Sequence, residues 1–362
     1  MTRDTDTTAA ASYFDHKRFN QSFTLPPSDN RPEGFKVTYA DFGNRRSEHV
    51  ILFCGPLVGS RFVLTTKHEF AEQHGVRIIS PDRPGFGGTP DVPPADRVRV
   101  WLEIVETLLQ HLGIQHVAIF AYSGGTVYAM NILLHLRHLL HPVHPYVALC
   151  TPWVHTSHSG VSALKLASLL PNGVIGTYDR LLRMISDMGP ALRFSNILSG
   201  FVPSLSGGSD AVAPGVDPDA VAREEGLLPQ LFGRIKNEDI IGISQDVLLL
   251  LKRDQYPECW GTWGDYDTLV PLLAEAESER RRSEPDTTSP LRVRVFFAAS
   301  DMLIGTTLGP AWLDDCWRPE QRGDNIDYSS VTIPKTTHDT VLDLRYGVFE
   351  QIVQDITSQN ID

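Results

Sequence analysis

The chain has 362 residues, of which 41% are hydrophobic and 21% charged, as in an ordinary globular protein. This length is enough to bury one large core, or one core together with a smaller accessory domain. The formal net charge of −12 argues against a polyanionic partner. The densest basic run, 280–282, is flanked by acidic residues and is typical of a solvated helix end. We therefore expect no nucleic-acid partner.

The cysteines and the N-terminal residues favour a cytoplasmic protein. The cysteines are widely spaced and form no Cys-x-x-Cys pair, so we expect no disulfide framework: Cys54, Cys150, Cys259 and Cys316. The first dozen residues lack the apolar stretch of a secretory signal. No run of about 18 apolar residues is present to span a bilayer. The sequence leaves the oligomeric state open.

The N-terminal third contains short strands that alternate with helices. Residues 1–20 are expected to be disordered, because the first dozen hold too little apolar surface to offset the entropy of ordering. Strands are predicted over the following ranges, with a helical stretch at 62–75 between the third and the fourth: 22–25, 35–42, 49–54 and 76–80. The run at 49–54, HVILFC, is continuously apolar, as in a strand buried on both faces of a parallel sheet.

The alternation continues to residue 150 and indicates one sheet with helices on both faces. A helix is predicted over 95–112, with Gly113 as its C-terminal cap, and strands over 116–122 and 146–150. Four strand–helix alternations in about a hundred residues predict an α/β protein with a doubly wound, mostly parallel sheet.

The region from 152 to 285 has a different texture and is predicted to be a helical cap inserted into the core. Helical patterns occupy 161–170, 177–188 and 246–252, a Ser/Gly/Pro-rich passage fills 199–218, and the charged run 277–286 is interpreted as the linker back. Strands resume at 291–298 and 328–333, and a final amphipathic helix is predicted over 341–356. The core is thus expected at 21–151 and 286–362.

The strongest chemical signal is Ala121-Tyr122-Ser123-Gly124-Gly125, which lies between a strand and a helix. It has the small-x-Ser-x-Gly pattern of a nucleophile elbow, with Ala in place of the first Gly. Small neighbours let strand and helix approach in a strained turn. The helix N-terminus behind Ser123 presents backbone N–H groups where an oxyanion would develop.

On these residues the chain resembles the α/β-hydrolase-fold serine hydrolases of the type with one core and a helical cap. The resemblance spans nearly all of residues 35–356. The loop Pro81-Asp82-Arg83-Pro84-Gly85-Phe86-Gly87-Gly88 resembles the one that follows the second core parallel strand in that family. Within it, Asp82 and Arg83 are expected to hold backbone turns. Its glycines lack the Gly-x-Gly-x-x-Gly spacing of a dinucleotide site.

The resemblance also implies a base and an acid for a catalytic triad. The family presents its histidine after the last strand, where this chain has Thr336-Thr337-His338-Asp339, and its acid after a late strand, where this chain has Asp301. A carboxylate at this place orients the imidazole and stabilises its protonated form. The rival carboxylates Asp265 and Asp267 lie in the predicted cap. The alternative acid position, after the strand ending at residue 150, carries no carboxylate.

The resemblance further implies an oxyanion hole with two backbone donors. One is Gly124, directly after the nucleophile. The other belongs to the family's His-Gly-x loop, which here reads Cys54-Gly55-Pro56-Leu57-Val58-Gly59. Cys54 replaces the usual histidine, and Pro56 has no N–H where a donor is common. The predicted second donor is therefore Leu57, and the altered loop leaves open a reshaped or weakened hole.

Two further groups of residues are less informative. A histidine cluster is interpreted as a polar helix end and loop rather than a metal site: His135, His138, His141, His144, His155 and His158. Apolar residues of the cap either line an acyl pocket or pack onto the core: Leu164, Leu169, Leu170, Leu181, Leu182 and Met184. We expect no metal and no organic cofactor.

These expectations combine into a serine esterase that works through an acyl-enzyme on Ser123. The favoured substrate is a small apolar carboxylic ester or lactone, a preference that rests on fold analogy. Haloalkane dehalogenases and epoxide hydrolases of this fold use a carboxylate where this chain has serine. Amide, thioester and C–C bond hydrolysis remain open, as does a lyase or a ligand-binding protein that kept the fold.

Overall fold

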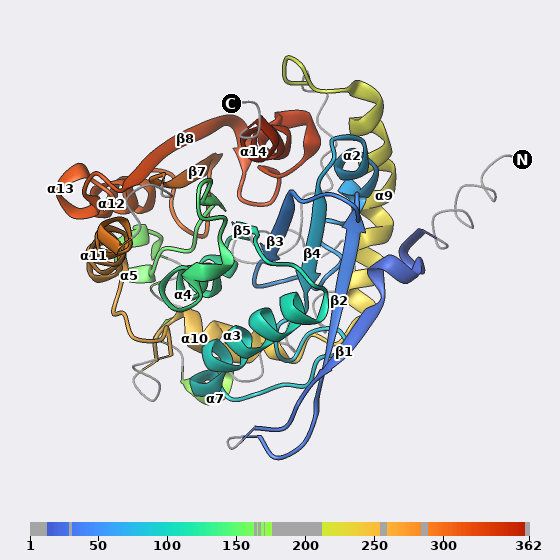
Figure 1. Cartoon of the computed structure of the whole chain (residues 1–362), viewed down its shortest axis with the longest axis horizontal. Helices are drawn as coiled ribbons and strands as arrows, with labels where there is room; N and C mark the ends of the chain where they lie inside the picture. The colour runs from blue at the N-terminus through green and yellow to red at the C-terminus, as the bar shows by residue number, and fades with distance from the viewer. Residues whose placement is uncertain are drawn as a thin grey trace, which may run out of the picture.

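The computed structural model of the chain centres on one eight-stranded sheet (Figure 1). It describes residues 13–28, 31–162, 165, 168–169, 171–175, 212–253, 259–283 and 289–358. The sheet order is β1-β2-β4-β3-β5-β6-β7-β8, in which β2 is antiparallel to both neighbours and every pair from β4 to β8 is parallel. The strands are β1 Gln21–Leu25, β2 Phe35–Gly43, β3 Val50–Cys54, β4 Arg77–Pro81, β5 Ala118–Tyr122, β6 Tyr146–Cys150, β7 Leu291–Ser300 and β8 Ile326–Thr337.

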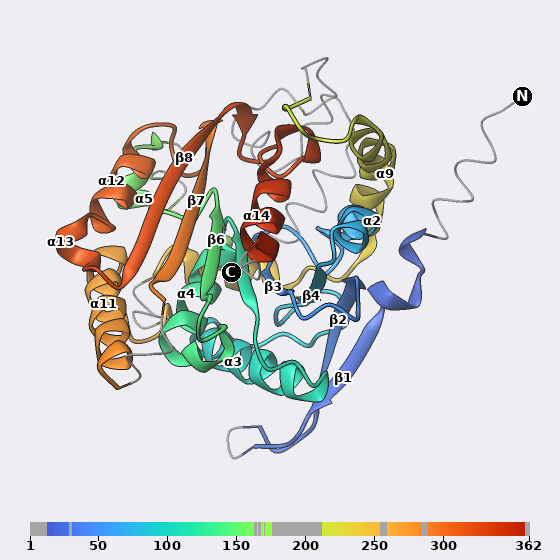
Figure 2. The ribbon, with the colours of Figure 1, turned by 45° about the horizontal axis from the view of Figure 1, so that its top comes forward.

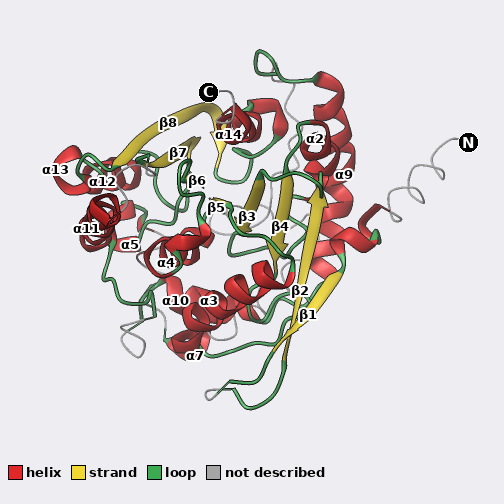
Figure 3. Ribbon diagram, viewed as in Figure 1, coloured by secondary structure: helices red, strands yellow, loops and turns green. Residues whose placement is uncertain are grey.

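Helices cover both faces of this sheet (Figures 1 and 3). Apolar side chains of α3 and α4 pack on one face, and those of α2, α9 and α14 on the other. The α-helices are α2 His68–Gln73, α3 Pro94–His111, α4 Gly125–His135, α5 Thr156–Ser159, α7 Asn172–Ile175, α9 Pro218–Asn237, α10 Gly242–Leu250, α11 Tyr266–Ser283, α12 Leu308–Cys316, α13 Pro319–Arg322 and α14 Val348–Thr357. Short 3₁₀ turns are η1 Lys17–Phe19, η2 Thr65–Lys67, η3 Arg137–Leu139 and η6 Leu344–Tyr346.

Continuous apolar runs account for the central strands. Every residue of β3, β5 and β6 is buried, because successive side chains point to opposite faces and both faces are covered. In β3, Leu52 packs with the α3 and α4 side, whereas Ile51 and Phe53 pack with the α14 side. The prediction of an α/β protein with a doubly wound, mostly parallel sheet is thus confirmed.

Every described element between β6 and β7 is helical, from α5 to α11. The predicted helix at 246–252 corresponds to α10, which begins earlier and ends at Leu250. The predicted helix at 177–188 lies outside the described residues, and so does most of the passage 199–218. The division into a core of 21–151 and 286–362 and a cap of 152–285 stays a prediction.

The predicted linker 277–286 is wrong over residues 277–283, where α11 continues to Ser283. Glu277 is buried, and its carboxylate lies 2.5 Å from Nε of Arg137 and 3.1 Å from a guanidinium nitrogen of Arg280. Glu277 follows buried Leu273 at four-residue spacing, so both lie on the same face of the helix. Because Glu277 is charged, this buried face was not recognised from the sequence. Glu277 thus continues the buried face of the helix as one half of an ion pair.

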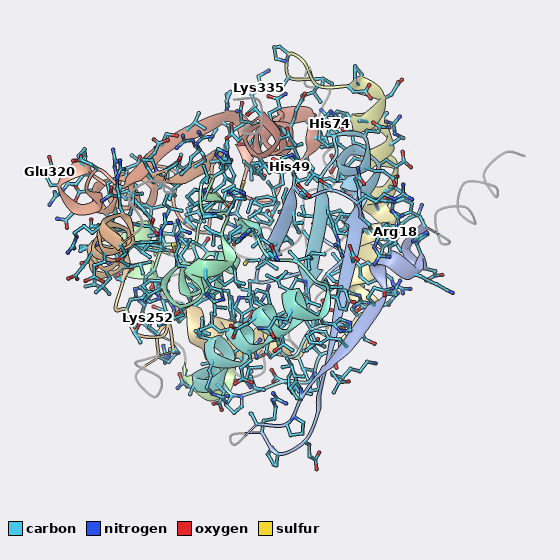
Figure 4. The ribbon with its side chains drawn as sticks, in the orientation of Figure 1. Arg18, His49, His74, Lys252, Glu320 and Lys335 are labelled. Carbon is cyan, nitrogen blue, oxygen red and sulfur yellow. The ribbon has the colours of Figure 1, made fainter. Side chains whose placement is uncertain are left out.

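The two ends of the chain also differ from expectation. Residues 13–20, expected to be disordered, pack onto the sheet through buried Phe14 and Phe19, while residues 1–12 lie outside the described part. Arg18 donates to the carbonyl of Gly43 at the end of β2 (Figure 4). The C-terminal helix begins at Val348 rather than 341, because Gly347 adopts a left-handed conformation after η6.

The helices α12 and α13, between β7 and β8, were not predicted. Strands β7 and β8 lie at the end of the sheet opposite β1 (Figure 2). In the described ranges, no helix combines the length and the apolar character needed to cross a membrane. All four cysteines are buried free thiols.

The Arg137–Glu277 ion pair allows a test of whether α11 extends through residue 277 with Glu277 on its buried face. Glu277→Ala should lower the free energy of unfolding by about 3–5 kcal/mol, because it leaves the partly buried Arg137 charge unpaired. Glu279→Ala, at an exposed position on the same helix, should change it by no more than about 0.5 kcal/mol. Urea unfolding followed by circular dichroism measures both, and equal effects would contradict the buried position of Glu277.

Candidate active site

The predicted site residues all follow the carboxyl ends of parallel strands. Ser123 comes directly after β5, Asp301 after β7 and His338 after β8, while the loop 55–59 follows β3. Because carboxyl ends of parallel strands share one edge of the sheet, residues more than two hundred positions apart meet there. This edge is also where open α/β sheets bind ligands.

Ser123 sits in a strained turn between β5 and α4. Its φ is +53°, a left-handed conformation that non-glycine residues rarely adopt. The turn is fixed by the Ser123 N–H, which donates to the Cys150 carbonyl at 3.0 Å. A Cβ on Gly125 would lie 2.1 Å from the Cys54 carbonyl oxygen. Only glycine therefore fits where the helix begins, and the local geometry of a nucleophile elbow is present.

Ser123, His338 and Asp301 form one hydrogen-bonded chain. The Ser123 hydroxyl oxygen lies 2.8 Å from Nε2 of His338, and Nδ1 of His338 lies 2.7 Å from a carboxylate oxygen of Asp301. Since a carboxylate only accepts, Nδ1 carries the proton and Nε2 is left to accept from the serine hydroxyl. All three side chains are buried, so little water competes for these bonds.

Backbone groups fix the orientation of the Asp301 carboxylate. Its Oδ1 accepts from the N–H groups of Leu303 and Ile304 at 2.8 and 2.9 Å, which leaves Oδ2 for His338. The rivals lie elsewhere: Asp265 pairs with Lys252 at 3.0 Å, and Asp267 is exposed. Of the three carboxylates considered from the sequence, the structure therefore places Asp301 against the histidine.

The environment of His338 favours its protonated form. Burial alone would lower the pKa of His338, but the charge of Asp301, their hydrogen bond and the nearby Asp339 outweigh it and raise that pKa above 6.5. Burial raises the pKa of Asp339. Asp301 thus stabilises an imidazolium next to Ser123.

Tyr122 holds the backbone of the histidine loop, a contact that the sequence analysis did not anticipate. Its hydroxyl donates to the His338 carbonyl at 2.7 Å, and the two rings stack with centroids 5.8 Å apart. The residue is the variable position of the elbow pattern, and nothing in the pattern itself indicates such a role. Because Tyr122 precedes Ser123, it links the serine turn directly to the histidine loop.

Two backbone N–H groups, those of Gly124 and Leu57, lie close to Ser123. The Leu57 nitrogen lies 3.5 Å from the position that a Cβ on Gly124 would occupy. Among the described residues, no hydrogen bond uses the N–H of Gly124 or of Leu57. Both are therefore available to a negatively charged oxygen. Cys54 is fully buried, and burial raises the pKa of its thiol, so it stays protonated.

The loop 81–88 holds backbone turns, as expected. Asp82 accepts from the Arg61 N–H at 2.6 Å and from the Thr38 hydroxyl at 2.6 Å. Arg83 donates to the carbonyls of Gly55 and Pro56, both at 2.7 Å. One partner was missed: Arg83 also pairs with Asp246 of α10 at 2.9 Å. A lone Asp in a helical segment gives no sequence signal of that contact.

The remaining candidate groups do not converge on this site. His141 and His144 stack on each other, and His158 stacks on Trp312. Within the described ranges, no group of three or more His, Cys, Asp or Glu side chains is placed to hold a metal ion. Leu169 is exposed, and the other apolar cap residues considered for an acyl pocket lie outside the described part.

Comparison with known proteins gives a match to one family model, described as alpha/beta hydrolase fold, over residues 64–180. This range includes Ser123 but neither Asp301 nor His338. No curated protein matches the chain.

Solved structures resemble the chain over nearly its whole length. A putative lipase from Acinetobacter baumannii is 13% identical, with a TM-score of 0.56 and 99% of each chain covered. An esterase from Exiguobacterium antarcticum is 14% identical, with a TM-score of 0.54 and 93% and 100% covered. An epoxide hydrolase from Vigna radiata is 12% identical, with a TM-score of 0.51 and 94% and 97% covered. At these identities the likeness is one of fold and not of reaction.

The His338–Asp301 contact predicts a titration change. In Asp301→Asn the pKa of His338 should fall, because burial then acts with only the weaker influence of Asp339 against it. NMR of ¹⁵N-labelled histidine, with the signal assigned by its loss in His338→Gln, measures the change. Asp265→Asn serves as the control and should leave the value in place. A His338 pKa that is the same in Asp301→Asn and the wild type would remove Asp301 as the partner.

Proposed function

From the α/β-hydrolase fold of this chain, we propose that it is a serine hydrolase that cleaves a carboxylic ester through an acyl-enzyme on Ser123. The observation that carries the proposal is the chain of two short hydrogen bonds from Asp301 through His338 to the Ser123 hydroxyl. A serine hydroxyl is a weak nucleophile until a base removes its proton, and this arrangement supplies the base and its orienting acid.

In the proposed acylation step, Nε2 of His338 takes the hydroxyl proton while Oγ of Ser123 forms a bond to the ester carbonyl carbon. The carbonyl oxygen becomes an oxyanion and accepts from the N–H groups of Gly124 and Leu57. The tetrahedral intermediate then expels the alcohol, which takes the proton from His338. Asp301 stabilises the imidazolium between the two transfers.

Deacylation repeats the sequence with water as the nucleophile. His338 accepts a proton from water, the hydroxide oxygen attacks the acyl carbon, and the serine oxygen leaves with the proton from His338. The steps balance with only the ester and water consumed, and they require no metal or organic cofactor. The helix dipole of α4 adds to the stabilisation of the oxyanion at each step.

Apolar side chains near Ser123 support a substrate with an apolar acyl group. A methyl carbon of Leu250 lies 3.0 Å from the position of a Cβ on Gly124, and Leu57 presents a partly buried apolar side chain in the same loop as its N–H. Small carboxylic esters and lactones are therefore the proposed substrates. Serine at the nucleophile position disfavours epoxide hydrolysis, the activity named for one of the compared structures.

Active-site labelling tests the nucleophile. A small fluorophosphonate should add to Ser123 in the wild type, and peptide mass spectrometry should locate the adduct on that residue. His338→Ala should slow labelling by several orders of magnitude, because the serine then loses its base. Asp301→Asn should slow it by about 10⁴-fold, as an altered tautomer does in other triads.

Matched controls separate the triad from general disturbance. His138→Ala, at an exposed histidine, and Asp265→Asn, at the rival carboxylate, should label at close to the wild-type rate. A folded wild-type protein that forms no Ser123 adduct would overturn the hydrolase proposal and favour a ligand-binding role for the fold.

The pH profile gives a separate test of the base. His338 must be neutral to accept a proton, and its pKa is raised above 6.5. The kcat/KM for p-nitrophenyl butyrate should therefore be high above the raised pKa and fall as the pH drops through it. The imidazolium–carboxylate pair has the opposite dependence: its contribution to folding stability is present below pH 6.5 and is lost as the pH rises through the raised pKa. An acid limb centred below pH 6.5 would contradict His338, with its raised pKa, as the base.

A further inference from the structure

Arg83 forms hydrogen bonds to backbone carbonyls of the loop that contains Leu57. One guanidinium nitrogen donates to the Gly55 carbonyl and another to the Pro56 carbonyl, both at 2.7 Å. The side chain is buried, with 4% of the residue exposed, so these charge-assisted bonds form away from competing water. The buried guanidinium group of Arg83 thus restrains the position of this loop.

The bond to Pro56 fixes the direction of the Leu57 N–H. The Pro56 carbonyl and the Leu57 N–H belong to one peptide group, which is trans and planar, so the oxygen and the hydrogen point in opposite directions. With the oxygen held by Arg83, the N–H points away from Arg83. Leu57 N lies on the Gly124 side, 3.5 Å from the position of a Cβ there. Donation to the oxygen also polarises the peptide and strengthens its N–H as a donor.

Because of Pro56, the loop depends on the Leu57 peptide for its donor. Proline has no N–H, so this residue of the loop contributes no donor, and the Leu57 peptide must be presented at the correct angle. No described hydrogen bond restrains the Leu57 N–H itself. Its direction therefore depends on what holds the opposite end of the peptide.

Asp246 of α10 determines where Arg83 can lie. Its Oδ2 accepts from Nε of Arg83 at 2.9 Å, and its Oδ1 accepts from Nε of Arg97 at 2.6 Å and from the Tyr128 hydroxyl. All four side chains are buried. A buried guanidinium without its counterion is costly, so Arg83 follows the position of Asp246.

Helix α10 is itself fixed to neighbouring segments. The indole N–H of Trp153 donates to the Leu250 carbonyl at 3.2 Å, and that of Trp260 donates to the Leu249 carbonyl at 2.8 Å. Just beyond the helix, Lys252 pairs with Asp265 (Figure 4). The position of Asp246 is therefore well defined by contacts on both sides of the helix end.

We propose that Arg83 is a positioning residue for the oxyanion hole, and that Asp246 couples helix α10 to that hole through Arg83. The inference rests on the proposed serine hydrolase function. It assigns to a helix from the segment between β6 and β7 a part in the chemical step, through the angle of one peptide group. Neither Arg83 nor Asp246 contacts the reacting atoms.

The experiment compares Arg83→Lys and Asp246→Asn with a matched control, Arg137→Lys, which alters a partly buried arginine–carboxylate pair away from the site. With p-nitrophenyl butyrate, Arg83→Lys should lower kcat by about 10- to 100-fold, since loss of a whole oxyanion donor costs about 10²- to 10³-fold. Its KM should stay within about threefold of the wild type. The isosteric Asp246→Asn should lower kcat in the same direction by less, and Arg137→Lys should leave kcat and KM unchanged.

Two further readouts distinguish positioning from general damage. Inhibition by a trifluoromethyl ketone, whose adduct carries an oxyanion, should weaken by the same factor as kcat. The pH of the acid limb should stay in place, because Arg83 does not contact His338 or Asp301. Melting temperatures show whether the control variant is destabilised to a similar degree.

The outcomes separate the two proposals. If the wild type turns over the ester and labels at Ser123, but folded Arg83→Lys and Asp246→Asn keep kcat within about twofold, this inference is overturned alone. An effect confined to KM overturns it too, because ground-state binding would then be the quantity that Arg83 supports. A wild type with neither turnover nor label overturns the hydrolase proposal and this inference together.

Discussion

The site depends on how closely the first turn of α4 approaches the end of β3. Gly125 leaves no room for a Cβ between the helix and the Cys54 carbonyl, and this contact brings the serine turn beside the loop 55–59. The positive φ of Ser123 is tolerated because the surrounding sheet over-determines the turn. Ser123, the Gly124 N–H and the Leu57 N–H are thus brought together by one packing contact between the start of a helix and the end of a strand.

Buried charge organises the loops around that contact. The acidic chain uses its few deeply buried arginines as connectors, each with a carboxylate partner: Arg61 with Asp82, and Arg83 and Arg97 with Asp246. Such pairs contribute little net stability compared with apolar packing, yet they tolerate few alternative geometries. Their effect is to make loops from β3, β4 and α10 adopt one relative arrangement. A site that must hold donors within a fraction of an ångström benefits from that restriction.

Local pattern predicted the sheet and, with the family resemblance, indicated three residues that form one hydrogen-bonded chain. The contacts between distant segments could not be predicted in this way. The buried strands β3, β5 and β6 are recognisable in the sequence as apolar runs. Ser123, Asp301 and His338 each follow a strand, in the order that the family resemblance implies. By contrast, Glu277 was assigned to a linker because its charge concealed its place on a buried helical face, and Gly347 broke a helix that apolar periodicity extended to 341. The partnership of Arg83 with Asp246 joins residues 163 positions apart, which no local pattern encodes.

The proposed triad is divided between the middle and one edge of the sheet. Ser123 follows β5, which has a hydrogen-bonded strand on each side, whereas His338 follows β8, which has only β7. Edge strands separate from a sheet more readily than central strands. Their amide hydrogens therefore exchange with solvent through local opening that costs less free energy than global unfolding. Fraying of the β7–β8 ladder would therefore shorten the lifetime of the proposed Ser123–His338 contact before the whole domain unfolds. Ligands or neighbours that hold β8 in place would extend that lifetime without touching the serine.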